Sequence, residues 1–589
     1  MIHEFSVWSP QCKSMKLIIS QDGSTQEFSL NKNSDDMWTH SVQISTDKPC
    51  FYQYRIDDDQ IVPDPCSHFQ PQGIDGPSEL IDHSSFSWND QNFTPPPWQK
   101  AIIYELHVGT FTAGGQFVDI INKLDYLLEL GVTHIELMPV TTFSGNYGWG
   151  YDSVFPFSPH AAYGRPEELK KLVDTCHQKG LAVILDVIYN HFGPNGNYFG
   201  SFAPYHTHRY QTPWGDAINY DDDYSDQVRQ MVIKNVDMWL SDYHFDGLRL
   251  DAIHAIFDQS ATHILEEINQ HVKILDQKLN KTHFMIAESD LNDPKVIRPL
   301  EDWGYGFQAQ WSDDYHHAIH SYLTGEQTGY YADFGRLSDI SKALQKGFIY
   351  DGNHAKSRKR KHGRALHNCS PRQLITCIQN HDQVGNRARG ERLSQILTPD
   401  QLKLAAGLNL LAPTTPLLFQ GEEWGASSPF LYFTNHQDPE LATAVREGRI
   451  REFVSFGWKK EDIPDPQEAL NFDLSKLQWE EKEWDDHHEI LSWYKKLLKL
   501  RKQYLDGESF QFLSAKNITV LEEEKIFLMQ NQSLSIVFNF ADQAQTFDFK
   551  LPIKTEKILA SSRSGVELKK DGIYMPAFSV GIFLKGESI

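Results

Sequence analysis

Short apolar segments alternate with longer amphipathic segments through the middle of this 589-residue chain. The apolar runs have the length of strands, and the segments between them repeat apolar positions at helical spacing. Two of these helical segments, residues 117–131 and 166–180, each end in glycine, a common helix stop. Strands that alternate with helices predict a parallel sheet, because parallel neighbours need a crossover connection.

Eight strands are expected in this region. They are residues 101–108, 133–140, 181–191, 246–252, 283–289, 307–311, 374–382 and 417–423. Eight strand–helix units within a few hundred residues predict a (β/α)8 barrel, the TIM barrel. The chain on either side has short strand-like segments separated by turn residues. We therefore expect an α/β protein with an N-terminal β-sandwich (residues 1–93), a barrel with loop insertions (residues 98–500) and a C-terminal all-β domain (residues 505–589).

Composition excludes several classes of function. The 79 acidic residues outnumber the 55 basic ones, so neither a nucleic acid nor an anionic membrane is an expected partner. The six cysteines form no CxxC pair, which argues against a disulfide framework or a cysteine-based zinc site. No secretory signal and no apolar run of the ~20 residues that cross a bilayer are visible, so we expect a cytoplasmic protein. The one basic run, residues 356–364, is expected to be a solvated loop.

Charged residues stand at the end of the fourth predicted strand, in FDGLRLDAIHAI (residues 245–256). Because side chains two apart on a strand share a face, Arg249 and Asp251 point the same way and Leu248 and Leu250 point the other way. Such a pair is either a structural ion pair or a carboxylate that a neighbouring cation keeps ionised, since a cation lowers the pKa of an aspartate.

Other predicted strands also end in polar residues, and the C-terminal ends of barrel strands form the active-site mouth. These residues are Asp186, Asn190 and His191 at the end of strand three, Glu288 at the end of strand five, His381 and Asp382 at the end of strand seven, and Glu422 and Glu423 at the end of strand eight. Such a set could bind a metal ion, but the spacing contains no compact ligand motif. Glycoside hydrolysis fits better, because it needs one carboxylic acid and one carboxylate. Loop aromatics, namely Tyr147, Trp149, Tyr151 and Trp214, could stack on sugars or simply pack.

Four stretches, FDGLRLDAIH, LDVIYNH, MIAESD and QNHD, resemble conserved regions of the α-amylase family of glycoside hydrolases, in the same order. The resemblance spans nearly the whole chain and implies an N-terminal sandwich of the glucan-binding type and a catalytic barrel. It implies Asp251 as nucleophile, Glu288 as general acid/base and Asp382 as the third carboxylate. It also implies substrate-binding or supporting roles for other residues: Arg249 keeps Asp251 ionised, His191 and His381 bind sugar hydroxyls, Tyr151 stacks under the ring, and Asp186 orders the site. Trp214 remains either a wall of the substrate cleft or a packing residue, and Glu422 and Glu423 are expected to be solvated or to anchor their loop, without a direct role in substrate binding.

Further stretches, including WGYDSVFPFSP, TPWGDAINYD and VREGRIREF, are similar to those members of the family that act on maltooligosyl trehalose. This implies a retaining hydrolase that cuts the α-1,4 bond next to the terminal trehalose, needs no cofactor and no metal ion, and works after a synthase that forms the trehalose end. One departure is Asn435 in FTNHQDP, where the pattern has Asp, and it puts a local outer-loop contact in doubt.

Three alternatives stay open. A glycogen branching or debranching enzyme would carry the same three carboxylates. A non-catalytic glucan-binding protein is disfavoured, because such relatives usually lose a catalytic carboxylate and all three are present here. A calcium site built from scattered loops also stays open, although no EF-hand loop is present.

Overall fold

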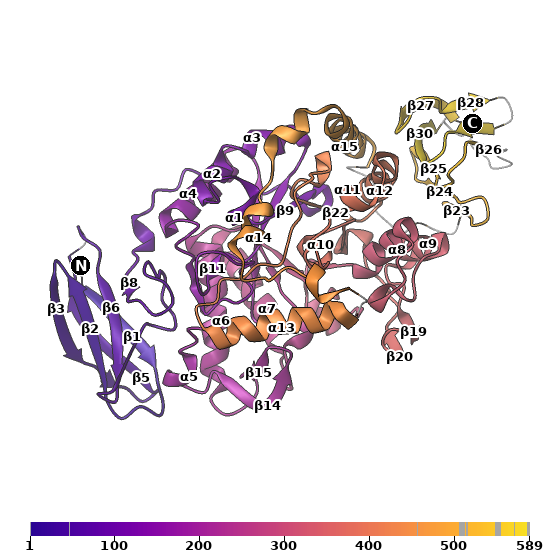
Figure 1. The fold of residues 1–589 in the computed structure, drawn as a ribbon. Coiled ribbons are helices and arrows are strands. Elements are labelled where there is room, and N and C mark those ends of the chain that lie inside the picture. The colour runs from indigo at the N-terminus through magenta and orange to yellow at the C-terminus, as the bar shows by residue number, and fades with distance from the viewer. Residues whose placement is uncertain are drawn as a thin grey trace.

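The computed structural model describes residues 2–45, 47–455, 458–505, 513, 516–547, 555–569 and 572–585. Its centre is a closed barrel of parallel strands, with the N-terminal strands at one end of the molecule and the C-terminal strands at the other (Figure 1). The barrel strands are β9 (Ile103–Leu106), β10 (His134–Leu137), β13 (Ala182–Val187), β16 (Gly247–Leu250), β17 (Phe284–Ala287), β18 (Ala309–Trp311), β21 (Leu374–Thr376) and β22 (Thr415–Phe419). All eight predicted strands are present, so the predicted fold class is confirmed.

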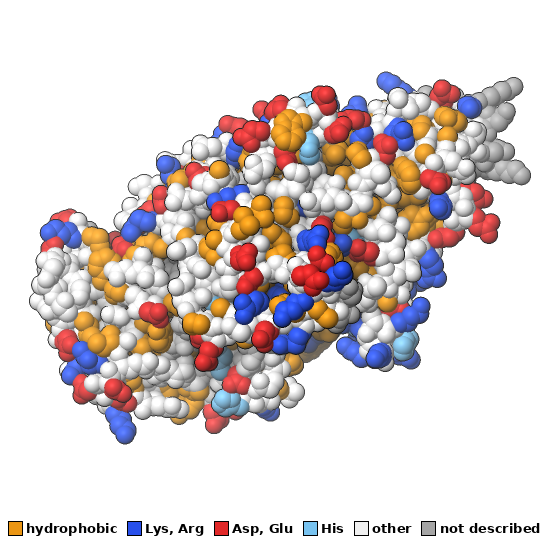
Figure 2. All heavy atoms as spheres, in the orientation of Figure 1, with side chains coloured by type: hydrophobic (Ala, Val, Ile, Leu, Met, Phe, Trp, Pro, Cys, Tyr) orange, Lys and Arg blue, Asp and Glu red, His pale blue; other side chains and the backbone are white. Residues whose placement is uncertain are grey.

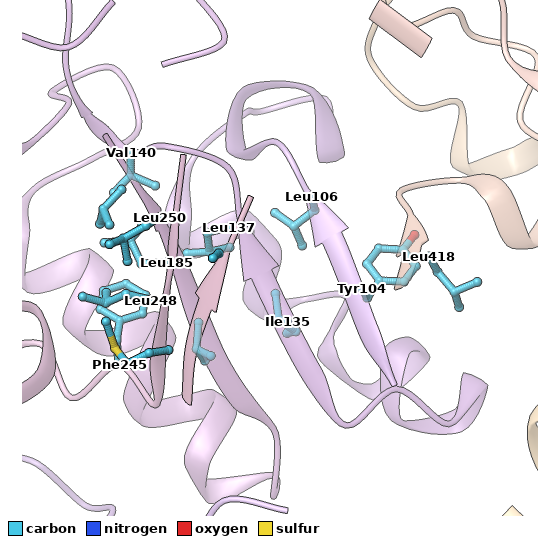
Figure 3. Close-up of a cluster of buried hydrophobic side chains, with 14 of the residues drawn as sticks. Tyr104, Leu106, Ile135, Leu137, Val140, Leu185, Phe245, Leu248, Leu250 and Leu418 are labelled. Carbon is cyan, nitrogen blue, oxygen red and sulfur yellow. The ribbon is translucent and has the colours of Figure 1, made fainter. Parts of the chain in front are cut away.

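The barrel separates two apolar cores because successive strand residues face opposite sides. Leu248 and Leu250 of β16 pack outward with Leu137 and Leu185 of neighbouring strands, in the layer between the barrel and its helices (Figure 3). A smaller core fills the inside of the barrel. Arg249 lies on the inner side, as its position between the two leucines predicts, and it is fully buried.

The predicted helical segments are also present. Residues 117–131 form two short helices, α2 (Phe117–Ile121) and α3 (Leu124–Leu130), and α3 ends at Gly131 with φ +108°. Residues 166–180 form α4 (Pro166–Gln178). Among the described residues, no helix is both long and apolar enough to cross a membrane.

Strands at both ends of the chain form pairs of antiparallel sheets. The N-terminal sheets contain β1 (Ile2–Trp8), β5 (Met37–Gln43) and β4 (Asn31–Lys32), and β3 (Ser24–Ser29), β2 (Met15–Gln21), β6 (Phe51–Ile56) and β7 (Gln60–Val62), with β8 (Ser78–Glu79) beside β6. The C-terminal sheets contain β23 (Ile518–Leu521), β24 (Ile526–Gln530), β25 (Leu534–Asn539), β30 (Ser579–Lys585) and β27 (Thr555–Ser561), and β26 (Gln545–Phe547), β29 (Gly572–Met575) and β28 (Glu567–Lys569). The sequence SFQFLSAK (residues 509–516) also predicts a strand, but most of it lies outside the described residues. We propose that the domain boundaries follow the expected limits of 1–93, 98–500 and 505–589.

The linker after the N-terminal sheets is fixed to the amino-terminal end of the barrel by a buried histidine. His177 Nδ1 lies 2.8 Å from Asp90 Oδ2 in the linker, and its Nε2 lies 2.9 Å from Asp246 Oδ2. Phe93 stacks on the same imidazole, with ring centroids 4.1 Å apart. Because Asp246 directly precedes β16, the linker is joined to the strand that carries Arg249.

The basic run at 356–364 is not a plain loop, which corrects the prediction. It forms the turn and second strand of a hairpin made by β19 (Asp351–Ala355) and β20 (Arg360–Gly363). Most of its basic side chains are exposed, but Arg358 in the turn pairs with Asp290 Oδ2 at 3.0 Å. Antiparallel pairing satisfies the backbone of this segment while the positive charges stay in water.

Candidate active site

A cleft of about 700 Å³ at the C-terminal ends of the barrel strands brings most of the predicted site residues together. Its lining includes Tyr151, His191, Trp214, Asp251, Glu288, His381 and Asp382. Asp186 and Arg249 do not line the cleft. They lie below it, with side chains that are 1% and 0% exposed, where they contact the residues above.

The guanidinium of Arg249 joins three carboxyl groups. Its Nη1 donates to both oxygens of Asp186, at 2.8 and 2.7 Å, and to Asp251 Oδ1 at 2.8 Å. Its Nη2 donates to Glu288 Oε2 at 3.0 Å. Since one cation cannot balance three buried negative charges, at least one of these carboxyl groups is favoured in its protonated form.

The environment separates the pKa values of Asp251 and Glu288. Burial acts to raise the pKa of Asp251, but the charge of Arg249 and a 2.7 Å hydrogen bond from Asn190 Nδ2 outweigh it and bring the pKa below its usual range. Burial raises the pKa of Glu288 well above its usual range, and the negative charges of Asp251 and Asp382 reinforce this against the opposing charge of Arg249. The site therefore holds one ionised carboxylate beside one neutral carboxylic acid, the pairing that acid–nucleophile catalysis requires.

The backbone after β16 takes part in this arrangement. Ala252 follows Asp251 directly and adopts a left-handed conformation with φ +38°. A non-glycine residue pays about 1–3 kcal/mol for such a conformation. The turn points the Ala252 N–H at Glu288 Oε2, 2.8 Å away. Both hydrogen bonds described for the Glu288 carboxyl group fall on Oε2, so Oε1 is the oxygen available to a substrate.

His381 is held by protein groups on both sides of its ring. Nδ1 donates to Glu105 Oε1 at 2.5 Å, and Nε2 lies 2.8 Å from the Tyr151 hydroxyl, which in turn donates to Asp186 Oδ2 at 2.7 Å. Burial acts to lower the pKa of His381, but the charges of Asp382 and Glu105 raise it to about 9. His381 is therefore an imidazolium at neutral pH, and a sugar hydroxyl would share Nε2 with Tyr151.

Trp214 is both a packing residue and part of the cleft wall. It lies in the turn between β14 (His206–Thr212) and β15 (Gly215–Ile218), and 47% of it is exposed. Its ring stacks on that of His191, with centroids 4.4 Å apart and planes 10° apart. Burial lowers the pKa of His191, so a neutral imidazole and an exposed indole face the cleft side by side.

Two further predictions concern residues outside the cleft. Glu422 and Glu423 are buried and not solvated, so of the two expected roles they have the loop-anchoring one: Tyr494 donates to Glu422 at 3.0 Å and Tyr126 donates to Glu423 at 2.8 Å. Asn435, the one departure from the family pattern, accepts a 3.0 Å hydrogen bond from the Asn146 N–H with its Oδ1. Among the described residues, no group of three or more His, Cys, Asp or Glu side chains is placed to hold a metal ion.

A pair of glutamates inside the barrel was not predicted from the sequence. Glu105 on β9 and Glu136 on β10 are register partners, and both are 1% exposed. Burial raises the pKa of Glu136 well above its usual range, and the charge of Glu105 adds to this effect. A glutamate in the middle of each of the apolar strands IIYELHV and THIELMPV was a visible signal, because a buried strand rarely carries a charge without a partner.

A second cavity of about 540 Å³ adjoins the cleft and was also missed. Its lining includes Asp290, Asp313, Tyr330 and Arg358, together with Asp382, Asn386, Arg449 and Glu452, which the two cavities share. The shared residues come from the loop after β21 and from α13 (Pro439–Ser455), a helix that crosses the face of the barrel domain in Figure 1.

Comparison with known proteins agrees with this site. The family model for the alpha amylase catalytic domain matches residues 80–216 and 216–507. The malto-oligosyltrehalose trehalohydrolase of Saccharolobus solfataricus is 45% identical over 500 residues, which is 85% of either chain. The enzyme of the same name from Rhizobium sp. (strain M-11) is 42% identical over 551 residues, 92% of either chain. The crystal structure of a putative alpha amylase from Salmonella typhimurium is similar with a TM-score of 0.88 and 35% identity, covering 99% of this chain and 98% of that one.

Proposed function

Because the chain belongs to the α-amylase family of glycoside hydrolases, we propose that its cleft hydrolyses the α-1,4-glucosidic bond next to the terminal trehalose of maltooligosyl trehalose. Relatives at 42–45% identity with near-complete coverage carry the name malto-oligosyltrehalose trehalohydrolase, which supports this substrate over a branching or debranching role. One observation supports this chemistry most directly. Asp251 and Glu288 bind the same guanidinium, yet the pKa of Asp251 is lowered and the pKa of Glu288 is raised.

The roles of the residues follow from their protonation. Asp251, ionised at neutral pH, attacks the anomeric carbon of the sugar on the non-reducing side of the cut. Glu288 gives its proton to the glycosidic oxygen, so that trehalose leaves as a neutral molecule. Glu288 then takes a proton from water, the water oxygen displaces Asp251 from the anomeric carbon, and the configuration of that carbon is retained.

The other predicted residues support this reaction. Asp382, partly exposed in the cleft, is placed to bind hydroxyls of the reacting sugar. Arg249 keeps Asp251 ionised, and Asp186 holds Arg249 and Tyr151 in place. Tyr151 is placed to stack under this sugar, His191 and His381 are placed to bind its hydroxyls, and Trp214 forms part of the cleft wall. The substrate implies a functional pairing with a synthase that converts the reducing end of a maltooligosaccharide into trehalose. The cytoplasmic location stays a prediction.

Product analysis on two parallel substrates tests the proposal. Purified protein is incubated with maltooligosyl trehalose and, separately, with maltohexaose, and Asp251→Asn serves as the inactive control. Rapid release of trehalose from the first substrate with little action on the second is the expected result. Equal cleavage of both would make the protein a general amylase, and new α-1,6 branches would make it a branching enzyme.

A further inference from the structure

Helix α13 forms a wall common to both cavities, and its Arg449 reaches toward the loop after β21. Leu441, Val445 and Gly448 line the larger cavity, Phe453 lines the smaller one, and Arg449 lines both. Acidic and basic side chains gather together on the face that α13 crosses (Figure 2). Among the described residues that line the larger cavity, Arg449 is the only lysine or arginine.

The guanidinium of Arg449 is fixed in place. It lies between the rings of Tyr432 and Phe453, 4.6 Å from each centroid. Its Nη1 donates to Asn386 Oδ1 at 3.0 Å, and its Nη2 donates to the Gly385 carbonyl oxygen at 2.9 Å. Two aromatic contacts and two hydrogen bonds to adjacent residues leave the side chain little rotational freedom.

This contact decides which way the Asn386 amide points. A guanidinium has only donors, so it selects the amide oxygen and turns the amide nitrogen to the opposite side. There Nδ2 donates to Asp382 Oδ1 at 3.2 Å. Without Arg449, the amide could rotate and present its oxygen to Asp382, which would replace an attractive contact with a repulsive one.

Arg449 also holds the short helix that carries the catalytic residues. Helix α10 (His381–Gly385) has His381 and Asp382 in its first turn, and the carbonyl of Gly385, which Arg449 binds, is at its end. A cation on the last carbonyl of a helix satisfies an acceptor that the helix itself leaves unpaired. The same side chain therefore fixes both the end of α10 and the amide next to Asp382.

We propose that Arg449 is a positioning residue for Asp382 and acts through the amide of Asn386. The inference rests on the proposed function, because it concerns the efficiency of the same hydrolysis. Asp382 would be held in the orientation that binds sugar hydroxyls as the ring distorts toward the transition state, so the main loss on removing Arg449 falls on kcat.

A double-mutant cycle tests this. Arg449→Met, Asn386→Ala and the double variant are compared with the wild type on maltooligosyl trehalose, with Arg451→Met as the matched control. Arg451 lies on the same helix and is exposed, with a 3.6 Å ion pair to Glu447. Arg449→Met and Asn386→Ala should each lower kcat by about 10- to 100-fold, which is the size expected for the loss of a hydrogen bond to a charged group. Each should change KM by less than about threefold. The double variant should be no worse than Asn386→Ala, because coupled residues are not additive.

Asn386→Asp separates positioning from folding. An aspartate at 386 can still accept from Arg449, so thermal stability should stay near the wild-type value, but it has no donor for Asp382 and kcat should fall as in Asn386→Ala. Arg449→Lys, which keeps the charge without the two-pronged donor, should recover only part of the activity.

Two results would overturn the inference. In the first, the losses of kcat in Arg449→Met and Asn386→Ala multiply in the double variant. In the second, Arg449→Met keeps the wild-type kcat. Both results require a wild-type protein that releases trehalose. A wild type that releases no trehalose would instead reject the proposed function.

Discussion

Arg249 donates to Glu288 Oε2 from one nitrogen of its guanidinium, and from the other nitrogen it donates to Asp251. The residue that must be protonated and the residue that must be ionised therefore share one cation. The cation does not bring them to the same pKa, because burial raises the pKa of Glu288 and the negative charges of Asp251 and Asp382 add to this effect.

Replacing this cation should shift the pH at which kcat/KM falls on the acidic side of its pH profile, here called the acid limb. The pKa of Asp251 is lowered in the folded protein, so activity should be lost only as pH falls through that low value. Arg249→Met removes the charge, and the acid limb of kcat/KM should move to higher pH by about 1–3 units. Arg501→Met is the control: Arg501 is also fully buried and binds the carbonyls of Leu410 and Thr414 away from the cleft. It should lower stability without moving the limb. An unmoved limb in Arg249→Met would remove the assigned role.

The stereochemistry of the product gives a second test. A nucleophilic Asp251 requires its carboxyl group to stand about 5–5.5 Å from that of Glu288, whereas an inverting pair stands about 6.5–9.5 Å apart. We expect the new reducing end to appear first as the α-anomer, which proton NMR resolves before mutarotation. Initial release of the β-anomer would exclude Asp251 as the nucleophile.

Glu105 should control the charge of His381 from below the cleft. The pKa of His381 is raised to about 9 by Asp382 and Glu105 against the opposing effect of burial. Glu105→Gln keeps a hydrogen-bonding group but removes one negative charge, so the pKa of His381 should fall. The imidazolium would then be lost at lower pH, and the basic limb of kcat/KM should move downward. An unchanged basic limb would mean that the charge of His381 does not matter for turnover.

Trp214 should affect substrate binding more than turnover. Its exposed ring lines the cleft and stacks on His191. Trp214→Ala should raise KM about fivefold or more, since an aromatic contact at a binding site is typically worth over 1 kcal/mol, with a smaller effect on kcat. Trp303 is 84% exposed and does not line either cavity, so Trp303→Ala is the matched control and should leave KM unchanged. Equal KM values for the two variants would make Trp214 a packing residue only.

The contact of His177 with Asp90 and Asp246, at the amino-terminal end of the barrel, should make the stability of the fold depend on pH. Burial acts to lower the pKa of His177, but Asp246 and Asp90 raise it to about 8, above its ordinary value of 6.5. The imidazolium should therefore add about 2 kcal/mol of stability below pH 6.5, and this should be lost as pH rises through 8. Melting temperatures at pH 6 and pH 9 measure the effect, which His177→Gln should abolish. His271→Gln removes a half-exposed pair with Asp237 and should change little.

The sequence was sufficient to place the barrel and the catalytic carboxylates because both depend on strand ends. Each strand has an apolar run of its own, and in a parallel barrel all C-terminal ends meet at one mouth. Asp251, Glu288 and Asp382 could therefore be assigned to one cleft from the strand ends alone, and all three line it in the structure. The strand limits were less accurate, since the predicted runs continued into loop residues such as Glu422 and Glu423.

Contacts made by side chains from distant segments could not be predicted in this way. Arg449 meets Asn386 across 63 positions of sequence, and no periodicity links a helix after the last barrel strand to the loop after the seventh. The hairpin at 351–363 was missed because a run of positive charge suggests a solvated loop, whereas strand pairing leaves those charges equally well solvated. Glu105 was visible, but its partner His381 lies 276 positions away.

Closure of the barrel also limits when this protein can first become active. Strand β9 pairs with β22, and Tyr104 on β9 donates to Glu423 after β22, 319 positions later. A ribosome adds about 5–20 residues per second, so the nascent chain exposes the unpaired edge of β9 for about 15–60 s before its partner emerges. During translation that edge is a site for misassembly or for a chaperone. Because Glu105 on β9 holds His381 at the site, catalytic activity should report a fully synthesised barrel rather than any shorter folded fragment.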